Sequence, residues 1–295
     1  MTASAHPVPA GARPPRNMTI ALTLAALAAF AANSLLTRAA LAPSTPRIDA
    51  TAFTFIRLAS GAVVLSALVG RRLLAPPTPA TRAWLGPLAL FLYAAPFTFA
   101  YRRIGAAMGA LLLFGTVQLT MLGWGVLRGE RLRLLGWLGV ALAFGGLLAL
   151  LAPATARPDV TGSLLMVLAG AAWGVYSLLG RGTGDALATN AWSFVLSVPC
   201  AAVLALLAPS TVPSSRVGVA LAIVSGAVTS GLGYAIWYRA LRGLTATRAA
   251  VVQVSVPVVA ALGGVVTLGE PLSLRLTLCG ALVLSGILLV VRARG

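Results

Sequence analysis

Long apolar stretches separated by short polar breaks run along the whole chain. Each stretch holds about 20 residues, which is the length that one helix needs to cross the hydrocarbon core of a bilayer. The breaks carry turn residues such as Pro43 and Ser44. The pattern predicts an all-α integral membrane protein with ten transmembrane helices, at residues 18–37, 50–69, 83–100, 104–126, 134–151, 161–180, 190–208, 217–238, 246–268 and 274–291.

The first five predicted spans resemble the last five. Residues 29–38 read AFAANSLLTR and residues 172–181 read AWGVYSLLGR, and residues 52–65 align in the same order with residues 191–204. Further matches follow in the same order towards the end of each half. We interpret the chain as a duplication.

Five spans per half is an odd number, so the second half must enter the membrane from the opposite side. This is the inverted-topology arrangement of many secondary transporters, in which substrate binds near the midplane between the repeats. The predicted organisation is a disordered cytoplasmic tail at 1–17, a first repeat at 18–152 and a second repeat at 161–292.

Composition supports the membrane assignment. Hydrophobic residues make up 59% of the chain and charged residues 9%, whereas soluble domains carry about 25% charged residues. The net charge of +17 comes from arginine alone, but these arginines lie singly or in pairs between apolar stretches, which argues against a nucleic-acid partner.

If the N-terminus is inside, 14 arginines lie in inner segments and 7 in outer ones, which predicts that both termini are cytoplasmic. The arginine-only, alanine-rich usage is typical of a GC-rich genome and suggests a bacterial inner membrane.

Polar and aromatic side chains inside the spans are candidate substrate contacts, because polar groups are costly in hydrocarbon. They recur at helical spacing and at equivalent positions of the two halves. We hypothesise that they line a central cavity. The candidates are Phe30, Asn33, Tyr93, Phe97, Gln118, Trp173, Tyr176, Tyr234 and Gln253. Alternatively, the polar ones bond neighbouring helices, and aromatic residues near span ends, such as Tyr101 and Tyr238, belong to the membrane interface.

Arg57 is the only charge well inside a predicted span. We expect a structural anchor whose side chain reaches outward towards the level of Asp49, with contact to an anion as the alternative. The five carboxylates, Asp49, Glu130, Asp159, Asp185 and Glu270, all fall at span ends or in loops. Proton-driven carriers commonly use a membrane-embedded acid, so either an edge carboxylate couples transport or the protein is a facilitator.

The order of several short motifs resembles the EamA-type branch of the drug/metabolite transporter superfamily. These motifs are Ala29-Phe30-Ala31 and Ala172-Trp173-Gly174, Phe53 with Arg57, Tyr-Arg-Ala-Leu at 238–241, and Pro257 followed by Leu-Gly-Glu-Pro-Leu at 268–272. The resemblance covers residues 18–292. It implies ten helices with pseudo-twofold inverted symmetry, export of amino acids, related metabolites or drugs, and a helix break at Pro257. Val117 stands at the equivalent position in the fourth span, where Gly115 would loosen the helix instead.

The predicted function is a secondary transporter, an exporter or facilitator of small metabolites such as amino acids or drugs, working by alternating access. A carrier of lipid-linked or phosphorylated substrates is the alternative, although such substrates need several cations. An enzyme is disfavoured, because no nucleophile, base or metal-ligand cluster is visible and Cys200, Cys279 and His6 lack ligand spacing. We expect no cofactor and no metal, a small-molecule substrate and the lipid bilayer as partners, and either a monomer or a homodimer.

Overall fold

The computed structural model describes residues 14–74, 84–129, 133–151, 159–180, 185–208, 212–244, 249 and 252–293. Within these ranges the chain is helical and contains no strand. The elements are α1 (Arg16–Leu41), α2 (Ala50–Val69), η1 (Gly70–Leu74), α3 (Leu85–Tyr101), α4 (Ala106–Leu127), α5 (Leu134–Leu151), α6 (Val160–Leu179), α7 (Ala186–Leu207), α8 (Arg216–Ile223), η3 (Val224–Leu232), α9 (Gly233–Leu241), α11 (Ser255–Leu268) and α12 (Leu274–Ala293).

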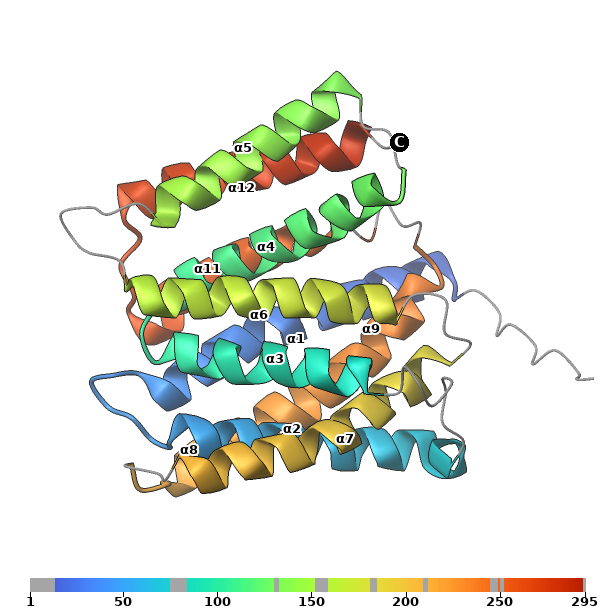
Figure 1. Cartoon of the computed structure of the whole chain (residues 1–295), viewed down its shortest axis with the longest axis vertical. Helices are drawn as coiled ribbons and strands as arrows, with labels where there is room; N and C mark the ends of the chain where they lie inside the picture. Colours follow the sequence, from blue (N-terminus) through green and yellow to red (C-terminus); the bar gives the residue numbers. More distant parts are fainter. Residues whose placement is uncertain are drawn as a thin grey trace, which may run out of the picture.

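Seven of the described helices are long and apolar enough to cross a membrane. One of them is the continuous run Arg216–Leu241, which joins α8, η3 and α9. Three further apolar helices, α3, α5 and α11, are shorter. The helices lie side by side in one elongated bundle, with the α5–α12 pair at one end of its long axis and α2, α7 and α8 at the other (Figure 1).

Helix packing pairs elements that are far apart in the sequence. α5 packs against α12, α2 against α7, and α4 against α11. α3 packs against α6, and α1 packs against η3, α9 and α11. The α5–α12 contact depends on small residues, because a Cβ atom added at Gly139 or at Gly286 would collide with the backbone of the other helix. Small residues allow such close approach between membrane helices.

The outer surface of the bundle is apolar. Leucine and valine side chains are exposed on most of the long helices, which is the pattern expected of a surface that faces lipid. Exposed Trp84, Trp124 and Trp137 lie near the ends of α3, α4 and α5. These three helix ends lie on the side of the bundle where α1 begins and α12 ends (Figure 1). We call this the terminal side. Its exposed tryptophans are typical of a membrane interface.

Aspartate and serine side chains fix several helix starts. Asp49, Asp159, Asp185 and Ser215 are the N-cap residues of α2, α6, α7 and α8, and each accepts a hydrogen bond from a backbone N–H of the first turn. Such caps stabilise a helix because the first N–H groups have no partner inside the helix. Three of the five carboxylates therefore have a structural task at a helix end.

The predicted spans agree closely with the observed helices in most places. The second and fifth spans match α2 and α5 residue for residue. The predicted tail at 1–17 ends too late, since α1 already begins at Arg16, and residues 1–13 lie outside the described residues.

Helix breaks were expected in the ninth and the fourth spans. In the ninth span a turn at Val254 precedes α11, which begins at Ser255. Pro257 lies in the first turn of that helix, where a missing N–H is tolerated. Val254 keeps α-helical backbone angles (φ −62°, ψ −21°), so a helix break at Pro257 stays a prediction. The expectation that Gly115 loosens the fourth span is wrong, because α4 runs through Gly115 without interruption.

The π-helix η3 was not predicted. A π-helix has a wider turn than an α-helix and is frequent at functional sites. At its start, Gly226 lies so close to α2 that an added Cβ atom would collide with the carbonyl group of Arg57. The backbone of η3 therefore packs directly against the middle of α2.

Candidate functional site

Aromatic rings from several helices meet in the middle of the bundle. Trp173 of α6 has its ring centroid 4.8 Å from that of Tyr93 of α3 and 5.0 Å from that of Tyr234 of α9. The Trp173 and Tyr234 rings are nearly parallel, at 24°. Phe30 of α1 lies 5.8 Å from Tyr234, and Phe97 lies 5.3 Å from Tyr93. These contacts make a continuous aromatic surface across four helices.

A polar network adjoins these rings. The Asn33 Oδ1 atom accepts hydrogen bonds from Ser225 at 2.7 Å and from Thr229 at 3.1 Å. The Asn33 Nδ2 atom lies 3.5 Å from the Tyr93 hydroxyl. Asn33 therefore connects α1 both to η3 and to α3.

Arg57 lies beside the same tyrosine and is 1% exposed. Its Nη2 atom donates to the Tyr93 hydroxyl at 2.9 Å. Its guanidinium carbon lies 4.8 Å from the ring centroid of Phe97 and 5.2 Å from that of Tyr93, within the range of cation–π attraction. The term central cluster is used below for the residues that these contacts join: Phe30, Asn33, Arg57, Tyr93, Phe97, Trp173 and Tyr234.

The expected outward path of the Arg57 side chain is wrong. The side chain stays buried, and its hydrogen bond links α2 to α3 instead. Asp49 is occupied elsewhere, because its Oδ1 atom accepts bonds from the backbone and hydroxyl of Thr51. Arg57 thus connects two helices, as an anchor does, but without a carboxylate.

A second polar contact extends from the cluster towards α7. Trp173 and Tyr176 are neighbours on α6, with ring centroids 5.3 Å apart. The Tyr176 hydroxyl is hydrogen-bonded to the Asn190 Oδ1 atom. Phe194, one turn further along α7, contacts Tyr234 at 6.1 Å.

The structure brings together most of the sequence-predicted cavity residues. Gln118 and Gln253 differ from the rest, because no hydrogen bond or ring contact joins either one to another described residue. Both are half-buried. Of the two alternatives for Tyr101, the membrane-interface position does not hold, because Tyr101 is fully buried, with its ring 4.8 Å from Phe97 and in close contact with Gly109.

Several cluster partners were missed from the sequence. Ser225 and Thr229 lie one turn apart and both bond Asn33, and Asn190 bonds Tyr176. The available signal was the run of small and hydroxyl residues at 225–231, SGAVTSG. Such a run is unusual within an apolar span, but it does not identify a partner.

The predicted cavity residues differ in exposure. Asn33, Tyr93, Phe97, Tyr176 and Tyr234 are buried, whereas Phe30, Trp173, Gln118 and Gln253 are half-buried. On α6 the buried Tyr176 and the half-buried Trp173 are neighbours, so exposure follows no common direction along the helices.

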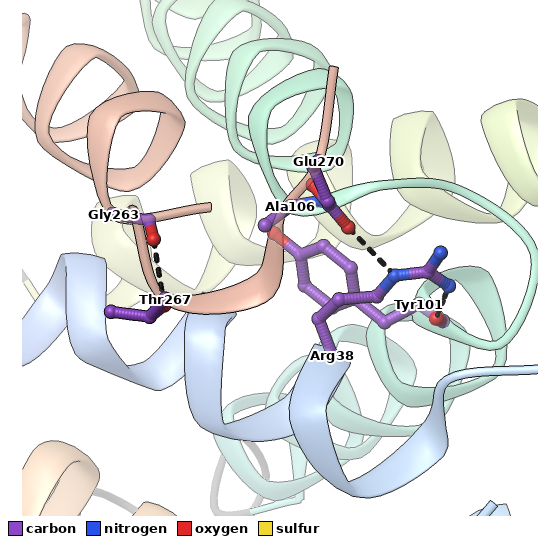
Figure 2. Close-up of polar contacts among 6 residues, drawn as sticks. All are labelled: Arg38, Tyr101, Ala106, Gly263, Thr267 and Glu270. Atoms are coloured by element: carbon purple, nitrogen blue, oxygen red, sulfur yellow. Dashed lines mark hydrogen bonds and ion pairs between the residues drawn. The ribbon is translucent and has the colours of Figure 1, made fainter. Parts of the chain in front are cut away.

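On the side of the bundle opposite the terminal side, an ion pair joins distant segments (Figure 2). The Arg38 Nε atom on α1 lies 2.9 Å from the Glu270 Oε1 atom in the connection between α11 and α12. Arg38 also donates to the carbonyl oxygen of Tyr101 at 2.8 Å, and the N–H of Ala106 donates to Glu270 Oε2 at 2.7 Å. Glu270 thus lies at the N-terminus of α4, where the helix dipole favours a negative charge. We call this arrangement the Arg38–Glu270 bridge.

The remaining described carboxylates lie at helix ends. Asp159 pairs with Arg103 at 3.0 Å, and the N–H of Gly162 together with Arg103 holds the pKa of the Asp159 carboxyl below its ordinary value. Asp185 pairs with Arg72 at 2.9 Å. Glu130 lies outside the described residues. Within the described ranges, no His, Cys, Asp and Glu side chains gather into a group that could hold a metal ion.

One shallow apolar hollow lies elsewhere, between α3 and α7. It is lined by Phe91, Pro199, Cys200, Val203, Leu204 and Leu207. None of the predicted cavity residues contributes to it. The central cluster, and not this hollow, gathers the polar and aromatic groups.

Residues 160–292 match the model of the EamA-like transporter family. The chain belongs to this family. The resemblance drawn from the sequence motifs is therefore confirmed, and the chain is a member of a family of membrane transporters. The matched residues correspond to the segment predicted as the second half.

Similar proteins span almost the whole chain. It is 51% identical over 280 residues to the uncharacterized protein PA1977 of Pseudomonas aeruginosa, covering 95% of this chain and 96% of that protein. It is 29% identical over 275 residues to the uncharacterized transporter YwfM of Bacillus subtilis, covering 90% and 91%. A crystal structure with 21% identity superposes with a TM-score of 0.66, covering 93% of this chain and 97% of that one, which supports the fold.

Proposed function

We propose that this EamA-family protein is a secondary transporter that moves small organic metabolites across the bacterial inner membrane by alternating access. The central cluster carries the proposal. It places a cation, an amide and several aromatic rings in the interior of an apolar bundle, where polar groups are costly unless they serve a substrate or each other. Small-molecule sites combine apolar walls with a few polar groups in this way.

The packing of the helices supports two inverted repeats. If the spans of one half correspond in order to those of the other, the pairs α5–α12, α2–α7 and α4–α11 each join equivalent helices. The α3–α6 contact then corresponds to the contact of α1 with η3 and α9. The central cluster draws its side chains from both halves, as expected of a substrate site at the repeat interface.

The Arg38–Glu270 bridge supports an alternating-access cycle. The bridge joins α1, α4 and the α11–α12 connection on the side opposite the termini. We assign this conformation to a state that is closed at the bridge.

The distribution of arginine supports cytoplasmic termini, because cytoplasmic segments are enriched in basic residues. The described carboxylates are N-caps or lie in ion pairs at helix ends. A proton carrier in the membrane interior is therefore missing from the described part of the chain. We favour a facilitator, with export driven by the substrate gradient.

Counterflow into liposomes containing the purified protein tests this proposal. A panel of amino acids, nucleobases and aromatic organic acids is offered, and at least one solute is expected to exchange. Trp173→Ala is expected to reduce that exchange several-fold, because it removes the ring between Tyr93 and Tyr234. Trp137→Ala, on the exposed surface of α5, is the matched control.

Absence of exchange for every solute would contradict the transporter proposal. Equal exchange by the Trp173→Ala and Trp137→Ala proteins, at equal amounts of folded protein, would contradict the placement of the site. Strong acceleration by an imposed pH gradient would contradict the facilitator mechanism.

A further inference from the structure

Arg57 is a buried cation without a counterion. It is the largest side chain among those that are almost completely buried. The three ion pairs among the described residues involve Arg38, Arg72 and Arg103, and none involves Arg57. Arginine stays protonated in proteins, so a full positive charge lies in the centre of the bundle.

The guanidinium is also short of hydrogen-bond acceptors. Nη2 donates to the Tyr93 hydroxyl, but Nε and Nη1 have no partner. Buried polar groups are nearly always hydrogen-bonded, and an exception calls for an explanation. Nε and Nη1 lie on different edges of the planar guanidinium, and each edge is completed by Nη2, which carries a second N–H beside the one donated to Tyr93. Either edge can bind a carboxylate with two parallel hydrogen bonds.

Nearby residues do not supply the missing negative charge. Asp49 is the closest carboxylate along α2, eight residues or about 12 Å away along the helix axis, and it is bonded to Thr51. Glu270 is held by Arg38 and the N–H of Ala106. The rings of Tyr93 and Phe97 attract the cation through their faces, but ring faces accept no pair of in-plane N–H bonds.

We propose that Arg57 is the anion subsite of this transporter, and that the substrates are organic monoanions with a carboxylate and a flat apolar part. The proposal rests on the transport function above and narrows its substrate class. The carboxylate pairs with the Arg57 guanidinium, and the flat part lies along the aromatic surface that includes Tyr93, Trp173 and Tyr234. A phosphorylated substrate, with two negative charges, would leave one charge unpaired, because Arg57 is the only buried basic side chain in the described ranges.

The central cluster contains no carboxylate, and this narrows the proposed substrate class further. A zwitterionic amino acid needs an acceptor for its ammonium group. The Asn33 Oδ1 atom already accepts from Ser225 and Thr229. Aromatic acids without an amino group therefore fit the described residues better than aromatic amino acids.

Ligand binding to the full-length protein in detergent tests the subsite directly. The probes are 3-phenylpropanoate, its uncharged amide 3-phenylpropanamide, phenylalanine and inorganic phosphate, and the readout is the shift of the thermal unfolding midpoint. The acid is expected to bind at least about tenfold more tightly than the amide, as a charge-assisted hydrogen-bonded pair implies. Phenylalanine and phosphate are expected to bind more weakly than the acid.

Variants then assign the preference to Arg57. Arg57→Gln is expected to bind acid and amide equally, and Arg57→Lys is expected to keep part of the preference because it keeps the charge. Arg216→Gln, an exposed arginine at the start of α8, is the matched control. Flux of 3-phenylpropanoate into liposomes is expected to fall about tenfold in Arg57→Gln.

The outcomes separate the subsite from the transport function. If the wild-type protein binds the amide as tightly as the acid, the anion subsite is overturned, whatever the variants do. If Arg57→Gln does not fold, this wild-type comparison still decides. If neutral solutes are exchanged and anions are not, the anion-subsite proposal is contradicted and the transport function is supported. If acid binds through Arg57 but no solute moves, the transport function fails and the subsite remains.

Discussion

Two arginines on successive helices, Arg38 and Arg57, lie in opposite electrostatic surroundings. Arg38 is 17% exposed and meets the carboxylate of Glu270 and the carbonyl of Tyr101. Arg57 is 1% exposed and meets a phenol hydroxyl and two ring faces. Arg38, whose charge is balanced by a carboxylate, is thus the more exposed of the two arginines.

This difference separates two uses of a positive charge in a membrane protein. A cation paired with a carboxylate holds elements together, as the Arg38–Glu270 bridge joins α1 to α4 and the α11–α12 connection. A buried cation without a carboxylate weakens the empty protein and is compensated only when an anion arrives. The first arrangement fixes a conformation, and the second selects a ligand.

Replacing each arginine by methionine gives the largest expected effect and tests the contrast directly. Arg38→Met leaves the Glu270 carboxylate without its cation and is expected to destabilise the folded protein by about 2 kcal/mol, less than a fully buried pair because both partners are partly exposed. Arg57→Met removes an uncompensated charge while keeping an unbranched side chain, so it is expected to leave stability unchanged or to raise it. Thermal unfolding in detergent measures both.

Equal losses from both substitutions would break the comparison, because they would mean that Arg57 already has full compensation in the empty protein. A Glu270→Gln protein serves as the control for the bridge. It removes the negative charge but keeps an acceptor for the N–H of Ala106. Its loss is expected to be smaller than that of Arg38→Met, because the remaining Arg38 charge keeps its bond to the Tyr101 carbonyl and the N–H of Ala106 keeps an acceptor.

The sequence was sufficient for the helices and for part of the candidate site. Spans of apolar residues are a local signal, which is why α2 and α5 were placed residue for residue. Asn33 and Tyr93 were singled out because polar and aromatic residues in hydrocarbon are rare. Both were expected to line a central cavity, and their contact with each other across α1 and α3 was not predicted.

The partners of the two arginines were beyond the sequence. Glu270 lies 232 residues from Arg38 along the chain, and the local pattern gives no reason to prefer that carboxylate over the others. The π-helix η3 was missed because its run of small and hydroxyl residues at 225–231 does not distinguish a π-helix from an α-helix. Its contacts with the backbone of Arg57 and the side chain of Asn33 form only in the assembled bundle.

Tyr93→Phe has a smaller expected effect and sharpens the description of Arg57. It removes the hydroxyl that accepts the Nη2 donor and keeps the ring below the cation. We expect a loss of about 1–2 kcal/mol, as for a hydrogen bond to a charged group. In an Arg57→Met background the same change should cost less, because the donor is gone.

The matched control is Tyr238→Phe. Tyr238 is half-buried against the core, and its hydroxyl makes no hydrogen bond to the described residues. An effect near zero is expected there. If Tyr93→Phe lowers the free energy of unfolding equally with and without Arg57, the Tyr93 hydroxyl stabilises the cluster through Asn33. Its hydrogen bond with Arg57 would then contribute nothing.

The smallest expected effect belongs to a third arginine, Arg103, whose pair with Asp159 is exposed. Asp159→Asn keeps an N-cap for α6, since asparagine caps as well as aspartate, and removes the charge opposite Arg103.

The pKa of the Asp159 carboxyl is lowered, first by the Gly162 N–H and then by Arg103. The charged carboxylate therefore stabilises the fold at pH values above its ordinary pKa of about 4. That contribution is lost as the pH falls through the lower pKa of the folded protein. We expect the variant to be less stable by under about 1 kcal/mol at pH 7, and the difference from the wild type to vanish in acid. A difference that persists in acid would mean that Asp159 acts through its cap geometry and not through its charge. The contribution of Arg103 to stability would then not depend on its pairing with a carboxylate, unlike the contribution expected of Arg38.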